Sequence, residues 1–342
     1  MGVMLTPIIK KRTVSLDDLR GLTIAVDANN ILHQFLALIR SPDGTPLMDS
    51  KKRATSHLVG LLLRTSRLIG RFGIFPVFIF DGEPPALKAG EIRRRRAARR
   101  KAEKEWKEAR RKGDLAKAFS KAVYSGRLTS DMTDDAKRLL ELMGVSQIQA
   151  PGEAEAQASF MAGKGQVWAV NSQDYDSLLF GAPRLLRYIT ISGKEFMPRK
   201  GESRPLRPEL IDSAVLLSHL GLTRDQLVDL SILIGTDYNQ GVFGIGPKKA
   251  LRLIGHFGSI EKMPPHMISG LDSNYQAVRD LFLHPTVSET CSITHAVLDE
   301  DGLIHFLCDE RDFARDRVEN AIETLRSGLS MRRSKRLMEY LS

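Results

Sequence analysis

Seven acidic residues each stand at the end of an apolar run or in the first turn after one. They are Asp27, Asp81, Glu153, Glu155, Asp174, Asp176 and Asp237. Carboxylates gathered in one folded site repel one another unless divalent cations neutralise their charge. Two Mg²⁺ ions about 4 Å apart can bind a scissile phosphate, activate a water and stabilise the leaving oxygen. The pattern therefore predicts a two-metal site that hydrolyses phosphodiesters.

Each acid taken singly also has an ordinary structural interpretation. Asp27 and Asp174 suit helix N-caps, and Asp81 begins a good turn sequence with the glycine and prolines that follow it. Glu153 and Glu155 diverge on a regular helix, so they converge only if the first turn is irregular or each serves a different metal. Repetition favours the site, because independent caps have no reason to cluster. The sequence leaves open which carboxylates bind an ion directly.

The elements that must position these acids alternate between strands and helices. Apolar runs predict strands at 22–26, 75–80, near 147 and at 166–170, and helical periodicity predicts helices at 31–39, 53–72, 131–143 and from Pro151 onward. This alternation predicts an α/β fold with a central, mainly parallel sheet flanked by helices. Such sheets place their sites beyond the carboxyl ends of the strands, where several of the acids fall.

Positive charge is concentrated in one segment. The chain has 51 Lys and Arg against 41 Asp and Glu, a formal charge of +10, and residues 88–112 alone hold 13 basic and 4 acidic side chains. This imbalance favours polyanionic partners. The segment leaves the sheet just after Asp81 and predicts a helix that buries little, on which Lys88 and Arg95 share one face and could both point at a phosphate. The alternative is a solvated helix or a disordered basic arm.

A glycine-rich turn at 241–250, GVFGIGPKKA, enters a predicted helix at Pro247. Free backbone N–H groups there, with Lys248 and Lys249 in the first helical turn, can grip a phosphate. The alternative is an ordinary turn. Its place just after Asp237 in a basic chain favours a clamp on the backbone of duplex DNA.

Cysteine content and apolar run lengths bear on the compartment. Cys291 and Cys308 are too few for a disulfide framework, which predicts a reduced, intracellular protein. The apolar runs fall far short of the roughly 18 residues that a membrane span needs, and no signal peptide is evident. No membrane association is expected.

Six sequence blocks spread over nearly the whole chain carry a family resemblance. They read DANNILHQFL, VFIFDGEPPALKAGE, PGEAEA, SQDYDSLLFGAPRL, ILIGTDYNQGVFGIGPKKAL and FLCDERDF. Together they resemble the blocks of flap endonucleases of the archaeal and eukaryotic type, within the structure-specific 5′ nucleases. The resemblance implies a PIN-like nuclease fold, a helical arch inserted to thread the 5′ flap, and a helix-hairpin-helix element that binds duplex DNA with a monovalent cation such as K⁺.

The resemblance also implies roles for residues that match the family's blocks. The seven acids fall on its positions for two Mg²⁺ ions, for which Mn²⁺ can substitute, and Lys88 and Arg95 on the basic arch residues that assist the phosphate in the transition state. The implied and predicted DNA contacts are Gly2, His33, Arg40, Arg64, Glu153, Gly235, Asp237, Gly244, Gly246, Lys248 and Lys249.

Two departures from the family pattern stand out. His33 replaces a tyrosine that stacks on a flap base, and its imidazole is expected to stack less well and to titrate near neutral pH. The tail keeps only part of a motif for a sliding clamp of the proliferating cell nuclear antigen type, with Leu337, Tyr340 and Leu341 as the expected contacts. The alternative for this tail is a short basic amphipathic helix with no partner.

The predicted organisation has five regions. They are a nuclease region at 1–100 that includes the start of the basic arch, the rest of the arch at 101–130, an internal nuclease region at 131–260 with the helix-hairpin-helix at 235–257, a C-terminal helical region at 261–325, and the tail at 326–342.

The predicted activity is that of a monomeric flap endonuclease. It would cut DNA near the junction of single and double strands, with 5′–3′ exonuclease activity, in Okazaki fragment processing and repair. It would act in the cytoplasm or nucleoid of an archaeon, or in the nucleus of a eukaryote. The alternatives are a sibling nuclease acting on other junctions and a non-catalytic junction-binding protein. The spacing of about 70 residues between Asp81 and Glu153 argues against the long-spacer type that cuts bubbles.

Overall fold

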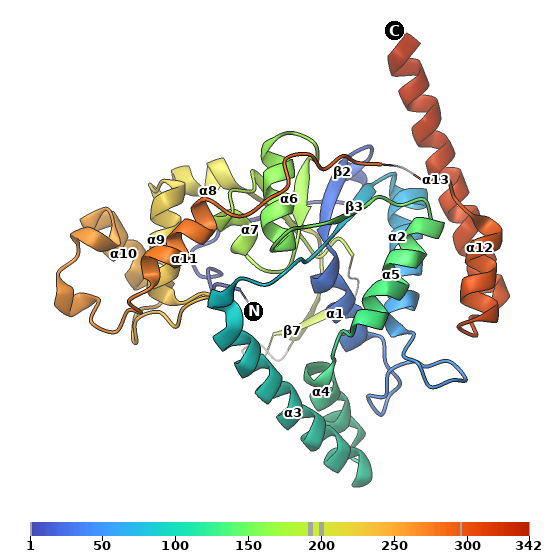
Figure 1. Ribbon diagram of the computed structural model, residues 1–342, viewed down its shortest axis with the longest axis horizontal. Helices are drawn as coiled ribbons and strands as arrows, with labels where there is room; N and C mark the ends of the chain where they lie inside the picture. Colours follow the sequence, from blue (N-terminus) through green and yellow to red (C-terminus); the bar gives the residue numbers. More distant parts are fainter. Residues whose placement is uncertain (1, 191–193, 198–201, 295, 342) are drawn as a thin grey trace.

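The computed structural model describes residues 2–190, 194–197, 202–294 and 296–341, and only the backbone for 194–197, 202–205 and 331–341. Its centre is a seven-stranded sheet (Figure 1). In spatial order the strands are β1 (Arg12–Thr13), β9 (Glu209–Asp212), β6 (Arg184–Arg187), β5 (Ala169–Asn171), β2 (Thr23–Asp27), β3 (Phe75–Phe80) and β4 (Gln147–Gln149).

The sheet is mainly parallel, as the sequence predicts. Strands β6, β5, β2, β3 and β4 run parallel to one another, and β9 pairs antiparallel with both β6 and β1. The predicted strand at 166–170 is shorter than expected and begins at Ala169. The helix predicted from residue 53 begins at Ser56, because an antiparallel bridge between Met48 and Ala54 keeps the preceding residues extended.

Alternation along β3 divides its side chains between two helical layers. Phe78 and Phe80 pack against α1 (Ala28–Leu38), α2 (Ser56–Phe72) and α5 (Ser130–Leu142), whereas Val77 and Ile79 pack against α6 (Ala154–Gly163). Because both faces are covered, the strand reads as a continuous apolar run. Figure 1 shows these two layers on opposite sides of the sheet.

A second core lies beside the sheet and is built mainly from short helices. They are α7 (Asp176–Leu179), α8 (Ser213–Leu220), α9 (Arg224–Ile234), α10 (Pro247–Phe257), α11 (Tyr275–Leu283) and the single turns η3 (Ile260–Lys262) and η4 (Pro265–Met267). The connection from α9 through a glycine-rich turn to α10 forms the predicted helix-hairpin-helix. Strands β7 (Lys194–Met197) and β8 (Glu202–Pro205) form a separate hairpin, and η1 (Asp17–Leu19) precedes β2.

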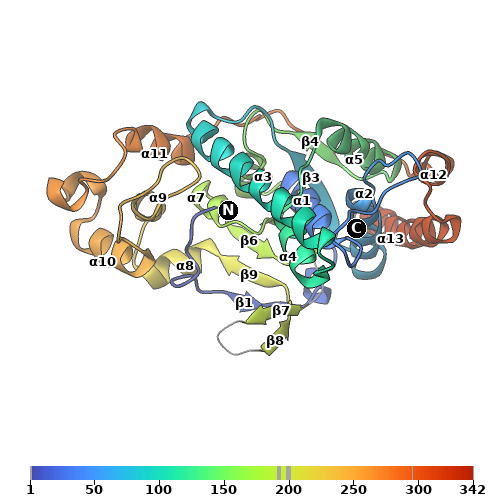
Figure 2. The same cartoon turned by 90° about the horizontal axis from the view of Figure 1, so that it is seen from below.

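The basic segment after β3 forms a helical hairpin. It starts with the turn η2 (Ala86–Lys88) and continues through α3 (Ala89–Arg111) and α4 (Leu115–Ser125); we call residues 86–125 the arch. Small residues bury between the two helices, namely Ala102, Ala109, Ala118 and Ala122. The Trp106 indole N–H donates to the Asp43 carbonyl at 2.9 Å, which ties the arch to the loop after α1. In Figure 2 the arch lies in front of the sheet, between the α8–α11 group and α2.

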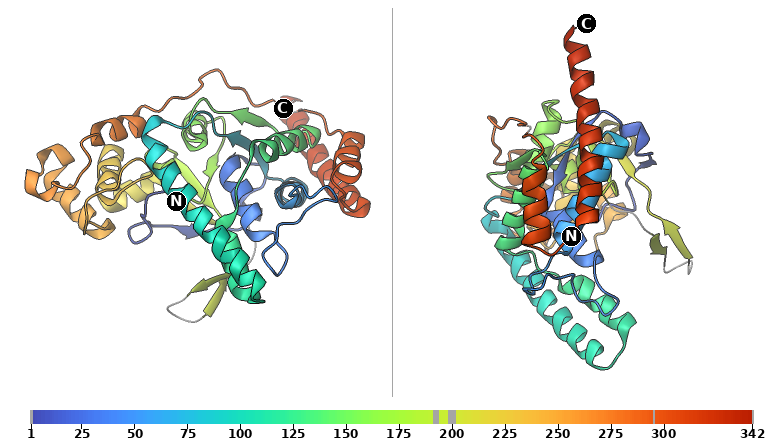
Figure 3. Two further views of the ribbon diagram at one scale, coloured as in Figure 1. Left: turned by 60° about the horizontal axis from the view of Figure 1, so that its bottom comes forward. Right: turned by 90° about the vertical axis from the view of Figure 1, so that its right-hand side faces the viewer.

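The C-terminal helices pack on the opposite flank. Helix α12 (Glu300–Ile304) leads through a π-helical turn, η5 (His305–Asp309), to α13 (Arg315–Leu341), which runs along α2 (Figure 3). A Cβ atom at Gly328 would lie 2.7 Å from the Gly70 Cα, so two glycines allow this close helix crossing. Among the described residues no helix is both long and apolar enough to span a membrane.

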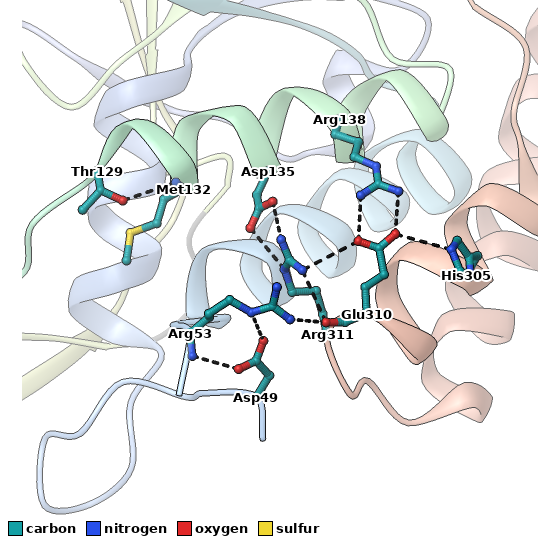
Figure 4. Close-up of polar contacts among 9 residues, drawn as sticks. All are labelled: Asp49, Arg53, Thr129, Met132, Asp135, Arg138, His305, Glu310 and Arg311. Atoms are coloured by element: carbon teal, nitrogen blue, oxygen red, sulfur yellow. Dashed lines mark hydrogen bonds and ion pairs between the residues drawn. The ribbon is translucent and has the colours of Figure 1, made fainter. Parts of the chain in front are cut away.

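Paired ions join α5 to the segment between α12 and α13 (Figure 4). Arg138 donates to both carboxylate oxygens of Glu310 at 2.6 and 2.8 Å, and Arg311 donates to both oxygens of Asp135 at 2.6 and 3.2 Å. Arg53 donates to the Glu310 carbonyl, which adds the loop before α2. Bidentate arginine pairs fix orientation as well as distance, so this network orients the segment that leads into α13.

A fully buried histidine in α2 lies beneath this network. Neither ring nitrogen of His57 has a hydrogen-bond partner among the described residues. Burial lowers the pKa of His57 from 6.5 to about 4, a shift that Asp135 opposes and Arg311 assists. The unfolded chain therefore binds this proton more readily than the folded one between those pH values.

We expect acid to destabilise the fold through His57. The neutral His57 contributes its full share to the free energy of unfolding above pH 6.5. That contribution is lost as the pH falls from 6.5 through about 4, and the loss amounts to about 3 kcal/mol at 1.36 kcal/mol per pKa unit. Urea unfolding at a series of pH values should show that the free energy of unfolding falls less steeply with acid in His57→Leu than in wild type. The exposed control His219→Leu should show the same pH dependence as wild type. An equal slope in wild type and His57→Leu would contradict the assignment.

Candidate active site

The acidic residues predicted as a group converge where the parallel strands end. We call them the acidic cluster: Asp27, Asp81, Glu153, Glu155, Asp174, Asp176 and Asp237. Asp27 ends β2, Asp81 follows β3 and Asp174 lies three residues beyond β5. Asp176 starts α7, and Asp237 comes from the loop after α9. The cluster therefore draws on both cores, with the sheet supplying one side and the helix-hairpin-helix the other.

Burial and mutual repulsion raise the pKa values within the acidic cluster. The pKa of Asp27 lies well above its ordinary value because of burial and then the charge of Asp81. That of Glu155 is likewise raised by burial and by Asp176, and that of Asp176 rises to about 7 through burial and the charges of Asp174 and Asp237. Ionising all of these groups together is costly unless compensating charge is present.

Backbone N–H groups from the N-terminal segment compensate part of this charge. The Gly2 N–H donates to Asp174 at 3.0 Å, and the Val3 N–H donates to Asp176 at 2.9 Å. A Cβ atom on Gly2 would lie 2.5 Å from an Asp176 oxygen, so glycine allows this close approach. The structure thus places Gly2 at the site, as the resemblance implies.

Two asparagines that the sequence reasoning missed also bind the acidic cluster. In the first turn of α1, the Asn29 amide donates to Asp81 at 2.7 Å and the Asn30 amide donates to Asp174 at 3.1 Å. The Ala154 N–H, at the start of α6, donates to the other Asp81 oxygen at 2.8 Å. The signal for the asparagines was their position directly after Asp27, but uncharged amides do not stand out in a charge pattern.

Glu153 and Glu155 point to different partners, which agrees with the expectation that they diverge. Glu153 is the extended N-cap of α6 and pairs with Lys88 Nζ at 2.5 Å. Glu155, in the first helical turn, accepts from the Ser177 hydroxyl at 2.9 Å. Burial lowers the pKa of Lys88, but Glu153 and nearby carboxylates outweigh it, so that pKa is raised overall.

The base of the arch is tied to the acidic cluster at a second point. Arg95 lies 2.6 Å from Asp237 and is also held by Glu91 at 2.7 Å. Lys88 Nζ sits 5.8 Å from the centre of the buried Tyr238 ring, a contact that the sequence reasoning also missed. Lys88 and Arg95 therefore both lie at the acidic cluster, as predicted from their separation of seven residues, which puts them on one face of a helix.

The donor set of the acidic cluster suits hard divalent cations. Within the described residues, no three His, Cys, Asp or Glu side chains are close enough as they stand to hold a metal ion. Lys88 and Arg95 occupy Glu153 and Asp237 in this arrangement. A small divalent cation keeps several waters and takes only a few carboxylates directly, so a loose cluster of oxygen donors fits such an ion.

Comparison with known proteins identifies the family. The XPG N-terminal domain matches residues 1–102 and the XPG I-region matches residues 144–237. The chain is 47% identical to Flap endonuclease 1 of Pyrococcus furiosus over 96% of each chain, and 50% identical to that of Caldivirga maquilingensis over 93% and 92%. The chain belongs to the flap endonuclease 1 family.

Solved structures agree with this assignment. Flap endonuclease-1 from Methanococcus jannaschii matches the present flap endonuclease with a TM-score of 0.77 and 39% identity, over 96% of this chain and 99% of that one. The catalytic core of Rad2 in complex with DNA substrate matches with a TM-score of 0.66 and 26% identity, over 94% and 96%. The predicted nuclease fold is therefore confirmed. The five predicted regions stay a prediction.

Two other predicted DNA contacts of this flap endonuclease lie on α2 and just after α1. Arg40 follows the C-cap of α1 and donates to the Gly44 carbonyl at 2.7 Å. Arg64 is half-buried on α2. Their roles as DNA contacts stay predictions.

His33 differs from the expectation of titration near neutral pH. The surrounding protein and then Arg99 lower its pKa to about 4, with Asp81 opposing and Arg95 assisting the shift. The ring itself is exposed on α1, so water moderates the burial effect, but the neighbouring positive charges act in the same direction. These surroundings favour the neutral imidazole in the DNA-free protein. The weaker and pH-sensitive stacking of His33 on a flap base stays a prediction.

The glycines of the helix-hairpin-helix perform distinct structural tasks. Gly235 ends α9 at φ +106°, where a Cβ atom would lie 2.7 Å from the Gln240 carbonyl oxygen. Gly244 has φ +76°, and Gly246 is the N-cap of α10. Lys248 and Lys249 are exposed in the first turn of that helix.

The predicted clamp contacts fall at the end of α13. Leu337, Tyr340 and Leu341 belong to this helix, but their side chains lie outside the described ones. The predicted clamp contact therefore stays a prediction.

Proposed function

We propose that this flap endonuclease hydrolyses a DNA phosphodiester near the base of a 5′ flap and that it uses two Mg²⁺ ions, for which Mn²⁺ can substitute. The observation that carries the proposal is the convergence of the acidic cluster with Lys88 and Arg95 at one edge of the sheet. Opposite charges from two elements meet where a phosphate with bound cations would fit.

The acidic cluster would hold the ions. Asp27, Asp174, Asp176 and Glu155 influence one another's charge and offer one set of oxygens, and Asp81 with Glu153 and Asp237 extends that set toward the arch. Bound there, the ions would lower the barrier to water attack and stabilise the leaving oxygen. The Gly2, Val3 and Asn29 donors keep the carboxylates oriented.

Lys88 and Arg95 would act on the scissile phosphate. Both already lie within 2.6 Å of carboxylates in the acidic cluster, and a cation that takes over Glu153 and Asp237 leaves the two basic groups free to bind a phosphate oxygen. Positive groups held in advance at the point where negative charge develops need no reorganisation during reaction. Their position at the base of the arch would put this charge beside the path of a threaded single strand.

The remaining predicted DNA contacts divide between the two parts of a flap substrate. His33, beneath the arch, would contact the single strand, and Gly244, Gly246, Lys248 and Lys249 of the hairpin would hold the duplex backbone with a K⁺ ion. The related Rad2 core was solved in complex with DNA substrate, which supports binding of DNA by this fold. Arg40, Arg64 and Gly235 would contact the duplex near the junction.

In the cell, we propose Okazaki fragment processing and repair by a monomer wherever DNA is replicated. A sliding clamp of the proliferating cell nuclear antigen type would bind α13 through Leu337, Tyr340 and Leu341. The predicted 5′–3′ exonuclease activity would use the same site.

Single-turnover cleavage tests the proposal. A labelled double-flap DNA should be cut at the flap base with Mg²⁺ and left intact without it, in preference to a blunt duplex and a four-way junction. Asp176→Ala should lose cleavage by more than a hundredfold and keep flap affinity, because it removes a proposed metal ligand and no basic contact. Preference for the four-way junction would indicate a sibling nuclease, and unchanged turnover in Asp176→Ala would refute the metal assignment.

Lys88→Ala and Arg95→Ala separate catalysis from anchoring. Removing either charge should lower the single-turnover rate at saturating enzyme by about a hundredfold, because each charge is proposed to stabilise the transition state more than the bound substrate. Arg94→Ala is the matched control, since Arg94 pairs with Glu91 on the exposed side of the same helix. A loss of affinity with an unchanged rate would show that Lys88 and Arg95 only anchor the DNA.

A further inference from the structure

One aromatic side chain projects from the tip of the helix-hairpin-helix. Phe243 is fully exposed, at 102% of the reference area. Among the described residues the next most exposed large apolar side chain is that of Val297, at 71%. The sequence reasoning assigned no role to Phe243. Burying such a ring against a partner removes a large apolar surface from water.

The turn beneath Phe243 holds the ring outward. The Ile245 N–H donates to the Val242 carbonyl at 3.0 Å, which closes a β-turn with Phe243 at the second position. Gly244 at the third position has φ +76°, a conformation that glycine adopts at no steric cost. The two ends of the turn face inward: Ile245 is buried, and Val242 packs on the second core and donates its N–H to the Leu233 carbonyl at 2.9 Å.

The surroundings of Phe243 indicate what it contacts. Lys248 and Lys249 are exposed in the next helical turn, beyond Gly246, and the whole chain carries +10. A partner that meets two ammonium groups and an apolar ring within a few residues must present negative charges beside apolar surface. Duplex DNA does so, because its phosphates flank the carbon surface of the deoxyriboses along the minor groove.

We propose that Phe243 is a DNA-contacting residue that packs on deoxyribose at the minor groove while Lys248 and Lys249 bind the adjacent phosphates. This proposal rests on the proposed function. The aromatic contact adds affinity that does not depend on salt, because an apolar contact releases no counterions from DNA. The hairpin thus combines salt-dependent contacts of two lysines with phosphates and a salt-independent contact of Phe243 with deoxyribose.

The salt dependence of DNA binding distinguishes the electrostatic contacts from the apolar one. We would measure the affinity of full-length variants for double-flap DNA in EDTA over a series of KCl concentrations. Phe243→Ala should weaken binding about tenfold at every concentration and leave the slope of log K against log[KCl] unchanged. Lys248→Ala should reduce the magnitude of that slope by about 0.9. Val297→Ala, which removes an exposed apolar side chain elsewhere, should bind as wild type does.

The outcomes separate this inference from the proposed function. Affinity in Phe243→Ala equal to wild type, or a loss accompanied by a smaller slope, would overturn the inference whether or not the wild type cuts flaps. Its melting temperature should match wild type, because the ring is fully exposed, so that weaker binding reports contact rather than misfolding. A tenfold loss at constant slope supports the inference even if cleavage of the flap by the wild type fails.

Discussion

Repulsion among buried carboxylates is the constraint on which the rest of this molecule depends. Burial and then the neighbouring carboxylates raise the pKa values of Asp27, Glu155 and Asp176 above their ordinary values, so the fold bears a cost for gathering these groups. The sheet makes the gathering possible, because parallel strands end at the same edge. Both faces of β3 are buried against helices, so the strand that leads to Asp81 is packed on each side.

The groups that offset this repulsion also connect the catalytic elements. Lys88 and Arg95 lie at the base of the arch, and their ion pairs bridge it to α6 on one side and to the loop after α9 on the other. The position of the arch over the sheet therefore depends on the charge of the cluster. Under the proposed two-metal mechanism, a cation that shares Glu153 or Asp237 would change the hold on the arch and so would couple metal binding to the path of the single strand.

The sequence predicted those features that leave a periodic or charged trace. The apolar run Phe75–Phe80 is a strand with those same bounds. Most of the seven acids follow a strand or lie at the start of a helix, and Asp237 reaches the cluster from the loop after α9. Donors such as Asn29 and contacts such as Tyr238 could not be predicted, since uncharged side chains become functional only through tertiary neighbours. The pKa of His33 depends on Arg99 in the arch, 66 positions away along the chain, which no local pattern reveals.

The most direct test of this account is the unfolding temperature of the DNA-free protein titrated with MgCl₂ or, at matched ionic strength, with KCl. If divalent cations relieve the repulsion within the acidic cluster, Mg²⁺ should raise the unfolding temperature of the wild type well beyond the effect of K⁺. In Asp176→Ala, which lacks one of the repelling charges and one proposed ligand, the gain should shrink. Equal effects of the two salts on the wild type would contradict the claim that the cluster is built around divalent cations.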